Sequence, residues 1–313
     1  MIAVTGVSGS GKTSLVIECL VPALQAVIQG TKLPEHVDSI EAKGIQSVKV
    51  IDSKPIGANV RSTVATYDGV FDDLRKLFAR TADAKAKGLT AGDFSYNTGK
   101  LRCPVCDGTG IITMDVQFLP DVDTICPSCG GSRYGKDAYD ILWKSKEKDS
   151  VSVSLPGLLK LTVEEAAGIL HEETKIAKQL KILQDLGVCY LTLGEATPAL
   201  SGGEAQRLKL AYEMETPQQG SVFVFDEPTI GLHPQDVKKL VLIFDHLIQL
   251  GATVIVIEHD LELVTNCDYI IDMGPWGGTE GGRVVVEGTP EAVAATSESI
   301  TGRYLKQELA EDK

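Results

Sequence analysis

The first pattern in the sequence that could carry chemistry is a glycine-rich loop at residues 6–13, which read G-V-S-G-S-G-K-T. This is the G-x-x-x-x-G-K-S/T pattern, placed between an apolar run and a stretch with helical spacing. In such a loop backbone N–H groups point at phosphate oxygens, and the helix end adds positive potential. A glycine-rich turn without a ligand is the alternative, which the flanking strand and helix disfavour. The candidate phosphate-binding residues are Gly6, Ser8, Gly9, Ser10, Gly11, Lys12, Thr13 and Ser14.

Two acidic residues at the end of a second apolar run would complete the chemistry of this loop. Lys12 would reach the β- and γ-phosphates, and the Thr13 hydroxyl would bind Mg²⁺. Residues 222–225 (V-F-V-F) lead directly into Asp226 and Glu227. Asp226 can hold the magnesium ion through water, and Glu227 can orient and deprotonate the attacking water. An ordinary strand ending at a polar turn explains this pair equally well by itself, and the phosphate loop favours the functional interpretation.

Residues 200–206 (L-S-G-G-E-A-Q) predict the start of a helix that could face phosphate. Ser201 and Glu204 have the S-x-x-E spacing of a capping box. The glycines leave bare N–H groups at the positive end of the helix, which suits a γ-phosphate. A well-capped helix accounts for Ser201 and Glu204, but it gives no reason for both Gly202 and Gly203.

A histidine follows a further apolar run, residues 254–257. There the imidazole of His259 could contact the γ-phosphate. A single histidine at the end of a strand is more often structural, so its functional interpretation depends on the other three motifs. Glu227 and His259 are therefore the candidate catalytic residues.

Four cysteines form two C-x-x-C pairs: Cys103 with Cys106, and Cys126 with Cys129. In a cytosolic chain such pairs indicate a metal site before they indicate disulfides. Two matched pairs fit a tetrahedral zinc site with four thiolate ligands, and glycines after each pair suit the tight turns. A redox C-x-x-C is the alternative, but it lacks a thioredoxin-like context here. We expect a structural zinc ion that holds together an insertion without a large core of its own.

Composition limits the class of protein. The 313 residues include 30 basic and 43 acidic ones, a formal charge of −13 that argues against a surface made wholly for nucleic acid. With 43% hydrophobic and 23% charged residues, a disordered or collagen-like chain is excluded. No apolar run reaches membrane length and no signal peptide begins the chain, so we expect a soluble, cytoplasmic protein. Basic residues outnumber acidic ones only modestly between residues 61 and 110, where a solvated mixed-charge face is the common explanation and a phosphate-backbone contact the functional one.

The elements that must position these residues alternate between continuous apolar strands and helices. This order predicts an α/β fold, a parallel sheet covered on both faces. Expected strands lie at 2–5, 222–225, 254–257, 269–271 and 283–286, and expected helices at 12–30, from 175, 201–215, 234–250 and after 289. The pattern is interrupted after the first helix. We therefore expect a phosphate-loop part at 1–30, an insertion at 31–160 with the zinc module at about 100–135, and the rest of the cassette at 161–313.

Four motifs occur in the order that is typical of ATP-binding-cassette (ABC) ATPases, which the chain therefore resembles. They are the phosphate loop, the L-S-G-G-E segment, the D-E pair and the histidine at the end of a strand. A zinc module lies between the phosphate loop and the helix expected at 201–215, which we call the signature helix. This arrangement resembles the UvrA family in particular, the ATPases that recognise damage in bacterial nucleotide excision repair and belong to its excision nuclease. The family's C-terminal cassette is matched over essentially the whole chain, including the segments at 61–67, 118–122, 226–233 and 301–306. The resemblance implies a P-loop ABC-type cassette with a parallel sheet, interrupted by a zinc-binding and helical signature insertion.

The resemblance also implies ATP, Mg²⁺ and Zn²⁺ as ligands and DNA as a partner, tested for distortion rather than read for sequence. In the family the region around this zinc module faces DNA, which points to Arg61, Lys100 and Arg102 as candidate phosphate contacts. Such cassettes work as head-to-tail dimers, so we expect a homodimer or pairing with a separate UvrA-like N-terminal cassette.

Three departures from the family pattern affect this expectation. Members of the family contain two cassettes, and the region of the first cassette that recruits a UvrB-type partner has no match in this sequence. Whether this chain binds such a partner is therefore undecided. The antiparallel strands that usually precede the phosphate loop and help to hold adenine are also not in the sequence. Ser53 stands where the family carries a glutamine that touches magnesium and the attacking water. The competing hypothesis is a regulatory UvrA-like paralogue linked to antibiotic resistance, or a truncated form, that uses ATP as a dimerisation switch without turnover.

Overall fold

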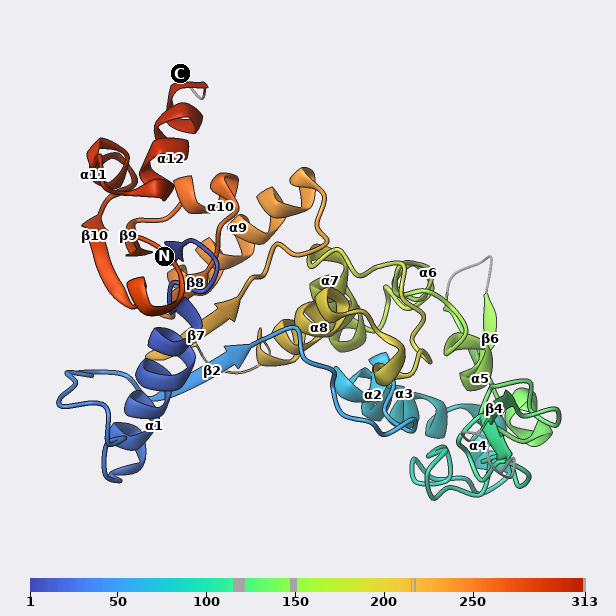
Figure 1. The fold of residues 1–313 in the computed structure, drawn as a ribbon. Helices are drawn as coiled ribbons and strands as arrows, with labels where there is room; N and C mark the ends of the chain where they lie inside the picture. Colours follow the sequence, from blue (N-terminus) through green and yellow to red (C-terminus); the bar gives the residue numbers. More distant parts are fainter. Residues whose placement is uncertain (115–121, 147–150, 215, 217, 312–313) are drawn as a thin grey trace. The chain divides into compact units, whose positions relative to one another are not determined.

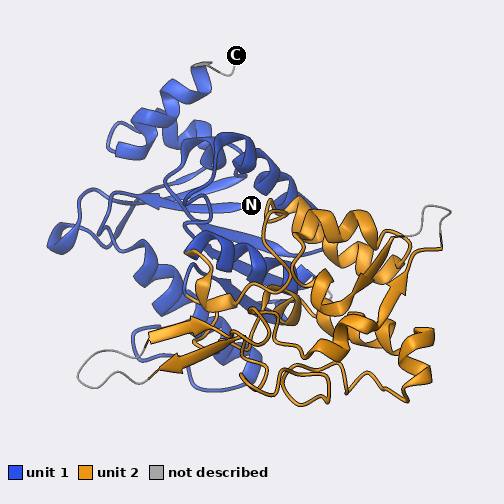
Figure 2. Ribbon diagram, turned by 90° about the vertical axis from the view of Figure 1, so that its right-hand side faces the viewer, with its two compact units in different colours: residues 1–54, 202–313 blue, residues 55–201 orange. Residues whose placement is uncertain are grey.

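The structure, a computed structural model, describes residues 1–114, 122–146, 151–214, 216 and 218–311. The chain forms two compact units, one from residues 1–54 and 202–313 and the other from residues 55–201 (Figure 2). Among the described helices none is long and apolar enough to cross a membrane.

The first unit is built on a six-stranded sheet with the order β10-β9-β1-β8-β7-β2 (Figure 1). Neighbouring strands are parallel throughout, except that β10 runs antiparallel to β9 at one edge. The strands are β1 (Ile2–Gly6), β2 (Ser47–Ile51), β7 (Ser221–Asp226), β8 (Thr253–Ile257), β9 (Tyr269–Gly274) and β10 (Arg283–Gly288).

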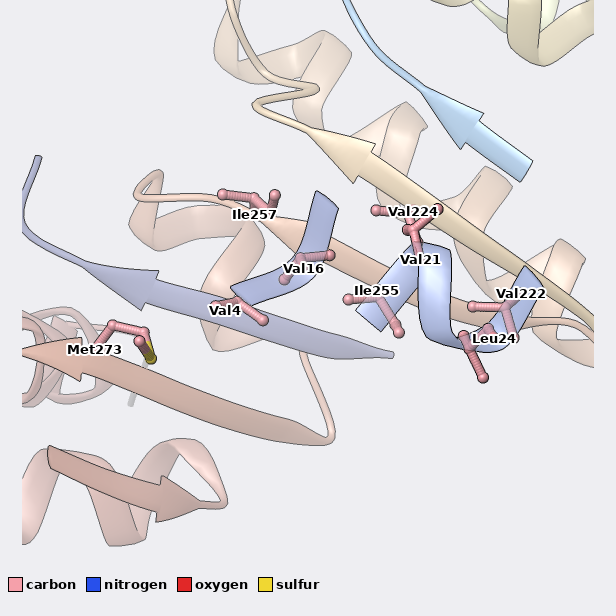
Figure 3. Packing of buried hydrophobic residues seen from close by; sticks show 9 residues of the cluster. All are labelled: Val4, Val16, Val21, Leu24, Val222, Val224, Ile255, Ile257 and Met273. Atoms are coloured by element: carbon pink, nitrogen blue, oxygen red, sulfur yellow. The ribbon is translucent and has the colours of Figure 1, made fainter. Parts of the chain in front are cut away.

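Both faces of this sheet are covered, as β7 illustrates. Val222 and Val224 belong to a buried aliphatic cluster with the residues after the phosphate loop (Figure 3). On the opposite face, the Phe225 ring lies 4.4 Å from that of Phe244 in a helix. Alternation along a strand buried on both sides gives this continuous apolar pattern. The cluster in Figure 3 consists of Val4, Val16, Val21, Leu24, Val222, Val224, Ile255, Ile257 and Met273.

The helix after the phosphate loop and the helices at 202–214, 234–249 and 290–295 lie close to the predicted positions, whereas those at 261–265 and 300–311 were not predicted. The helix after the phosphate loop begins as a π-helical stretch, Ser14–Leu20, and continues as α1 (Val21–Gln29). Thr289 accepts a hydrogen bond from the N–H of Ala292 and so caps α11, as its position before a proline predicts. The remaining helices are α8 (Gly202–Met214), α9 (Pro234–Gln249), α10 (Leu261–Thr265), α11 (Pro290–Ala295) and α12 (Ile300–Glu311).

The second unit combines short helices with two small hairpins. Its helices are α2 (Val64–Tyr67), α3 (Val70–Ala79), α4 (Ala82–Ala86), α5 (Leu155–Leu158), α6 (Val163–Ile169) and α7 (Thr174–Asp185). Its strands are β3 (Ile111–Met114), β4 (Val122–Ile125), β5 (Leu142–Lys144) and β6 (Ser152–Ser154). In the described part of this unit, β3 pairs with β4 and β5 pairs with β6.

The expectation that the insertion lacks a large core is wrong for this unit. Tyr96 and Tyr134 are fully buried, with ring centres 6.1 Å apart, and Phe71 lies 4.8 Å from Tyr96. The Tyr134 hydroxyl donates to the carbonyl oxygen of Phe94 at 2.6 Å. The small segment around the cysteines is poorer in apolar partners, because among the described residues its cluster consists of the four cysteines and Ile112.

The compact units also divide the chain differently from the expected boundaries at 30, 160 and 161. Residues 47–51 form β2, which pairs with β7 and belongs to the main sheet. The second unit therefore starts at Pro55 and ends at Ser201. The sequence does not predict this strand, because four of its five residues are only half-buried and its sequence, S-V-K-V-I, has no continuous apolar run. The segments of family resemblance at 118–121 and the expected helix end at 215 lie outside the described residues.

Candidate nucleotide site and zinc centre

The phosphate loop connects β1 to the π-helical stretch. The Lys12 ammonium donates to the carbonyl oxygens of Gly6 at 2.9 Å and Val7 at 3.1 Å, so it lies across the loop. Ser10 is buried, and its hydroxyl has no hydrogen-bond partner among the described residues. The half-buried members of the loop are Gly6, Gly11 and Lys12, and the exposed ones are Ser8, Gly9, Thr13 and Ser14. A loop with exposed hydroxyls at Ser8, Thr13 and Ser14 and a half-buried lysine can hold a polyphosphate.

Asp226 is the last residue of β7, and Glu227 follows it directly. Burial, with the nearby carboxylates of Glu227 and Asp52, raises the pKa of Asp226 above its ordinary value. A divalent cation would relieve this repulsion, so the chemistry of the pair fits magnesium. Glu227 has φ 47°, a left-handed conformation that is strained for a residue with a side chain, and its N–H donates to the carbonyl oxygen of Ile257 at 2.9 Å.

His259 is held at the end of β8 by a buried glutamate that the sequence reasoning missed. The Glu258 carboxylate accepts the N–H of His259 at 2.7 Å and the N–H of Thr229 at 3.1 Å. The Thr229 hydroxyl also donates to it. Glu258 is fully buried, whereas the His259 side chain is 68% exposed and can reach a ligand. A charged residue inside the apolar run I-V-I-E-H was the available signal, because buried carboxylates need such partners.

The sheet brings these groups together. Val4 and Asp226 both lie beside Ile257, because β8 sits between β1 and β7. The phosphate loop, the Asp226–Glu227 pair and His259 therefore leave the sheet at the same edge, the carboxyl ends of its parallel strands. This is where open α/β sheets bind ligands.

The signature helix α8 begins at Gly202, as the segment predicts. Both glycines have packing reasons that the sequence did not suggest. A Cβ on Gly202 would lie 3.0 Å from the carbonyl oxygen of Ser53, and one on Gly203 would lie 3.1 Å from that of Ile230. The close approach of backbones thus explains both glycines without phosphate. A nucleotide role for Ser201, Gly202 and Gly203 stays a prediction.

Gln206 in the same helix connects the strand ends that carry the acidic groups. Its side-chain amide is buried and donates to the carbonyl oxygens of Ile51 at 2.9 Å and Asp226 at 3.0 Å. Lys209, one turn later, donates to the carbonyl oxygen and the carboxylate of Asp52. The helix thereby fixes the end of β2, just before Ser53, relative to Asp226.

The four cysteines of the second unit converge, with all sulfur atoms within 4.8 Å of one another. The sulfurs of Cys103 and Cys126 are 4.0 Å apart, and those of Cys106 and Cys129 are 3.7 Å apart. These separations match the roughly 3.8 Å between thiolates that bind one tetrahedral zinc ion at about 2.3 Å, and they are too long for disulfides. The set therefore fits zinc.

Backbone N–H groups surround the sulfurs. The N–H of Gly110 donates to the Cys106 sulfur at 3.3 Å. Burial disfavours the Cys103 thiolate, but the N–H groups of Cys106 and Val105 outweigh it and lower the pKa of Cys103 to about 7. Such donors prepare thiolates for a cation and are the usual surroundings of a metal ligand.

The three candidate DNA contacts all lie in the second unit and all have carboxylate partners. Arg61 and Arg102 both pair with Asp107, at 3.4 and 3.0 Å, in the turn that follows Cys106. Lys100 pairs with Asp93 at 3.4 Å while its side chain is 78% exposed. The zinc module and its neighbour Arg61 therefore carry one exposed cation, Lys100, and two half-buried ones, whose charges are partly balanced by Asp93 and Asp107.

Comparison with known proteins gives whole-chain relatives. UvrABC system protein A of Staphylococcus aureus (strain COL) is 45% identical over 316 residues, which cover 100% of this chain and 33% of that protein. The protein of the same name from Clostridium acetobutylicum is 46% identical over 311 residues, 98% of this chain and 32% of the relative. The crystal structure of UvrA2 from Deinococcus radiodurans superposes with a TM-score of 0.87 at 40% identity, covering 98% of this chain and 37% of that one. No family model matches the chain. The chain spans about a third of the length of the curated relatives it matches.

Proposed function

We propose a function from the premise that this chain belongs to the UvrA family, of whose members it spans about a third. It is an ABC ATPase that binds and hydrolyses ATP and thereby controls binding to damaged DNA in nucleotide excision repair. The observation that supports this best is the meeting of the phosphate loop, the Asp226–Glu227 pair and His259 at one edge of a parallel sheet.

Each group would have a defined task. Loop N–H groups and Lys12 would hold the phosphates, and Thr13 with Asp226 would hold Mg²⁺. Glu227 would accept the proton of a water whose oxygen attacks the γ-phosphorus, while the bond to the leaving ADP oxygen breaks. His259 would donate a hydrogen bond to the γ-phosphate. Ser201, Gly202 and Gly203 would cover the γ-phosphate bound by another cassette.

Because these groups would come from two cassettes, the proposed site requires that cassettes assemble in pairs. The cassette would act with a second copy or with a separate N-terminal cassette, and ATP would close the pair. Zn²⁺ bound by Cys103, Cys106, Cys126 and Cys129 would fix the module that carries the DNA contacts. From the family resemblance we propose a cytoplasmic protein that acts on DNA.

Replacing Lys12 by alanine tests the nucleotide site. The loss of a charged hydrogen bond to phosphate is worth about 1.5–3 kcal/mol, so ATP affinity should fall about 10- to 100-fold. Titration calorimetry with Mg·ATP measures it, with K239A, an exposed lysine of α9, as the matched control. Equal affinity of K12A and the wild type, in a protein that is still folded by circular dichroism, would remove the assignment.

Charge changes around Asp107 test DNA binding. The double variant K100A/R102A should weaken duplex binding about equally for all sequences and lower the slope of log K against log salt by about 2. D107N should strengthen binding, because it removes the negative charge that pairs with Arg61 and Arg102, and asparagine tolerates the φ of 50° found there. Fluorescence anisotropy over a salt series, with K181A in α7 as control, measures both. Effects of the same size in K181A would argue against this surface.

One observation favours a second function, an ATP-driven dimerisation switch without turnover. Ser53 stands where the resemblance expects a glutamine, and its backbone is packed against Gly202. If hydrolysis by the wild type is no faster than that of a Glu227→Gln variant while both dimerise with ATP, the switch replaces the ATPase.

A further inference from the structure

We propose that the indole of Trp276 is the stacking surface for the base of the bound nucleotide. This inference rests on the proposed nucleotide site and assigns it a base subsite. The residue lies in the loop between β9 and β10, residues 275–282, which no motif in the sequence had singled out.

This glycine-rich loop lies directly on the phosphate loop. The N–H of Gly278 donates to the carbonyl oxygen of Gly9 at 3.1 Å, and the N–H of Gly282 donates to that of Ser10 at 2.9 Å. A Cβ on Gly277 would come within 2.7 Å of the Ser8 carbonyl oxygen. Two backbones this close allow little relative movement, so the residue before Gly277 has a fixed place beside the phosphate loop.

The strand order indicates which end of a nucleotide would reach Trp276. On one side of β1 lie β8 and β7, which carry His259, Asp226 and Glu227, the groups suited to the γ-phosphate and magnesium. On its other side lies β9, whose Met273 pairs with Gly6 at the start of the phosphate loop. A nucleotide whose γ-phosphate is directed to β7 and β8 extends its base toward the loop that follows β9.

Trp276 suits a base in both exposure and chemistry. Its side chain is 57% exposed, whereas Trp143 of the second unit is 5% exposed. An indole offers a wide apolar face that stacks on any base, because every base has a π-face. The subsite would therefore accept purine and pyrimidine nucleotides by stacking, with the phosphate loop supplying affinity that does not depend on the base.

The test compares a nucleotide with its phosphate chain alone. Affinities for Mg·ATP and for Mg·tripolyphosphate, which has no base, are measured by calorimetry for the full-length wild type, W276A and W276F. Stacking contributes about 10- to 100-fold in affinity, so W276A should lose that factor for ATP and retain its affinity for tripolyphosphate. W276F should keep most of the ATP affinity. Y304A removes another aromatic side chain that is 57% exposed, in α12, and should change neither ligand.

The outcomes separate the two proposals. If the wild type binds both ligands, K12A weakens both and W276A binds ATP as the wild type does, the stacking role is overturned and the nucleotide site stands. An equal loss for ATP and tripolyphosphate in W276A would show that the loop supports the phosphate loop without contacting the base, which also overturns it. If the wild type binds neither ligand, the proposed nucleotide site fails and the base subsite fails with it.

Discussion

Replacing Glu227 by glutamine is expected to lower the rate of ATP turnover by a factor of about 10² to 10⁴ while ATP still binds. The amide has the shape of the carboxylate but cannot accept the proton of the attacking water. The left-handed backbone at Glu227 and its hydrogen bond to Ile257 make no use of the carboxylate, so the fold should be unaffected.

The same variant should change the pH dependence of Mg·ATP binding in a defined direction. Burial is the largest cause that raises the pKa of Asp226, and the charge of Glu227 adds to it. Removing that charge lowers the pKa of Asp226 toward its ordinary value. The loss of magnesium-dependent affinity as pH falls should therefore begin at a lower pH in E227Q than in the wild type.

Steady-state phosphate release, calorimetry over a pH series and light scattering with Mg·ATP measure these effects. A protein that binds ATP without cleaving it should accumulate in the closed pair, so E227Q should approach twice the monomer mass or join a partner cassette. Glu308→Gln, in α12, is the matched control and should behave as the wild type. If E227Q still turns over ATP, another group is the base. If the protein stays monomeric at saturating ATP and turns over ATP without a partner, the proposal that two cassettes share each ATP site is contradicted.

Replacing Cys103 and Cys126 by serine is expected to lower the zinc content from one ion per chain to none. Structural zinc contributes about 10–16 kcal/mol in comparable small sites at neutral pH. The hairpin of β3 and β4 cannot replace that contribution, since most of its side chains are half-buried or exposed. The segments that contain the four cysteines should therefore lose their order, and the proposed DNA contacts around Asp107 should be lost with them.

Elemental analysis of protein purified under reducing conditions measures the metal, and hydrogen exchange locates the loss of order. Cys189→Ser, a cysteine of the second unit outside the cluster, serves as control and should keep its zinc. ATP affinity should remain near the wild-type value, because the phosphate loop belongs to the first unit. Zinc retained by the double variant, or a metal-free wild type, would contradict the assignment of the four cysteines to zinc.

Local sequence patterns were sufficient to predict the parallel α/β class and the strands β1, β7 and β8. Each strand is a short continuous apolar run, and such runs identify strands buried on both faces. The metal site formed by the four cysteines was equally predictable, because two C-x-x-C pairs indicate a metal site once disulfides are disfavoured. The resemblance to the UvrA family rests on local motifs in a fixed order, which need no tertiary information.

Other features depend on tertiary contacts. Strand β2 joins the main sheet through its pairing with β7, although its half-buried residues have no apolar run, and this moves the start of the second unit to Pro55. Gly202 and Gly203 permit the close approach of Ser53 and Ile230, which a motif cannot reveal.

The same holds for residues that act across long separations in sequence. Glu258 at the end of β8 accepts the N–H of Thr229, and Gln206 connects Ile51 to Asp226, through hydrogen bonds that form only once the sheet is assembled. The loop that contains Trp276 lies against the phosphate loop because β9, near the end of the chain, pairs with β1 at its start. The chemistry of a side chain can be predicted from the sequence, because it is a local property. The partner of a buried polar group depends on the order of the strands, which only the folded chain determines.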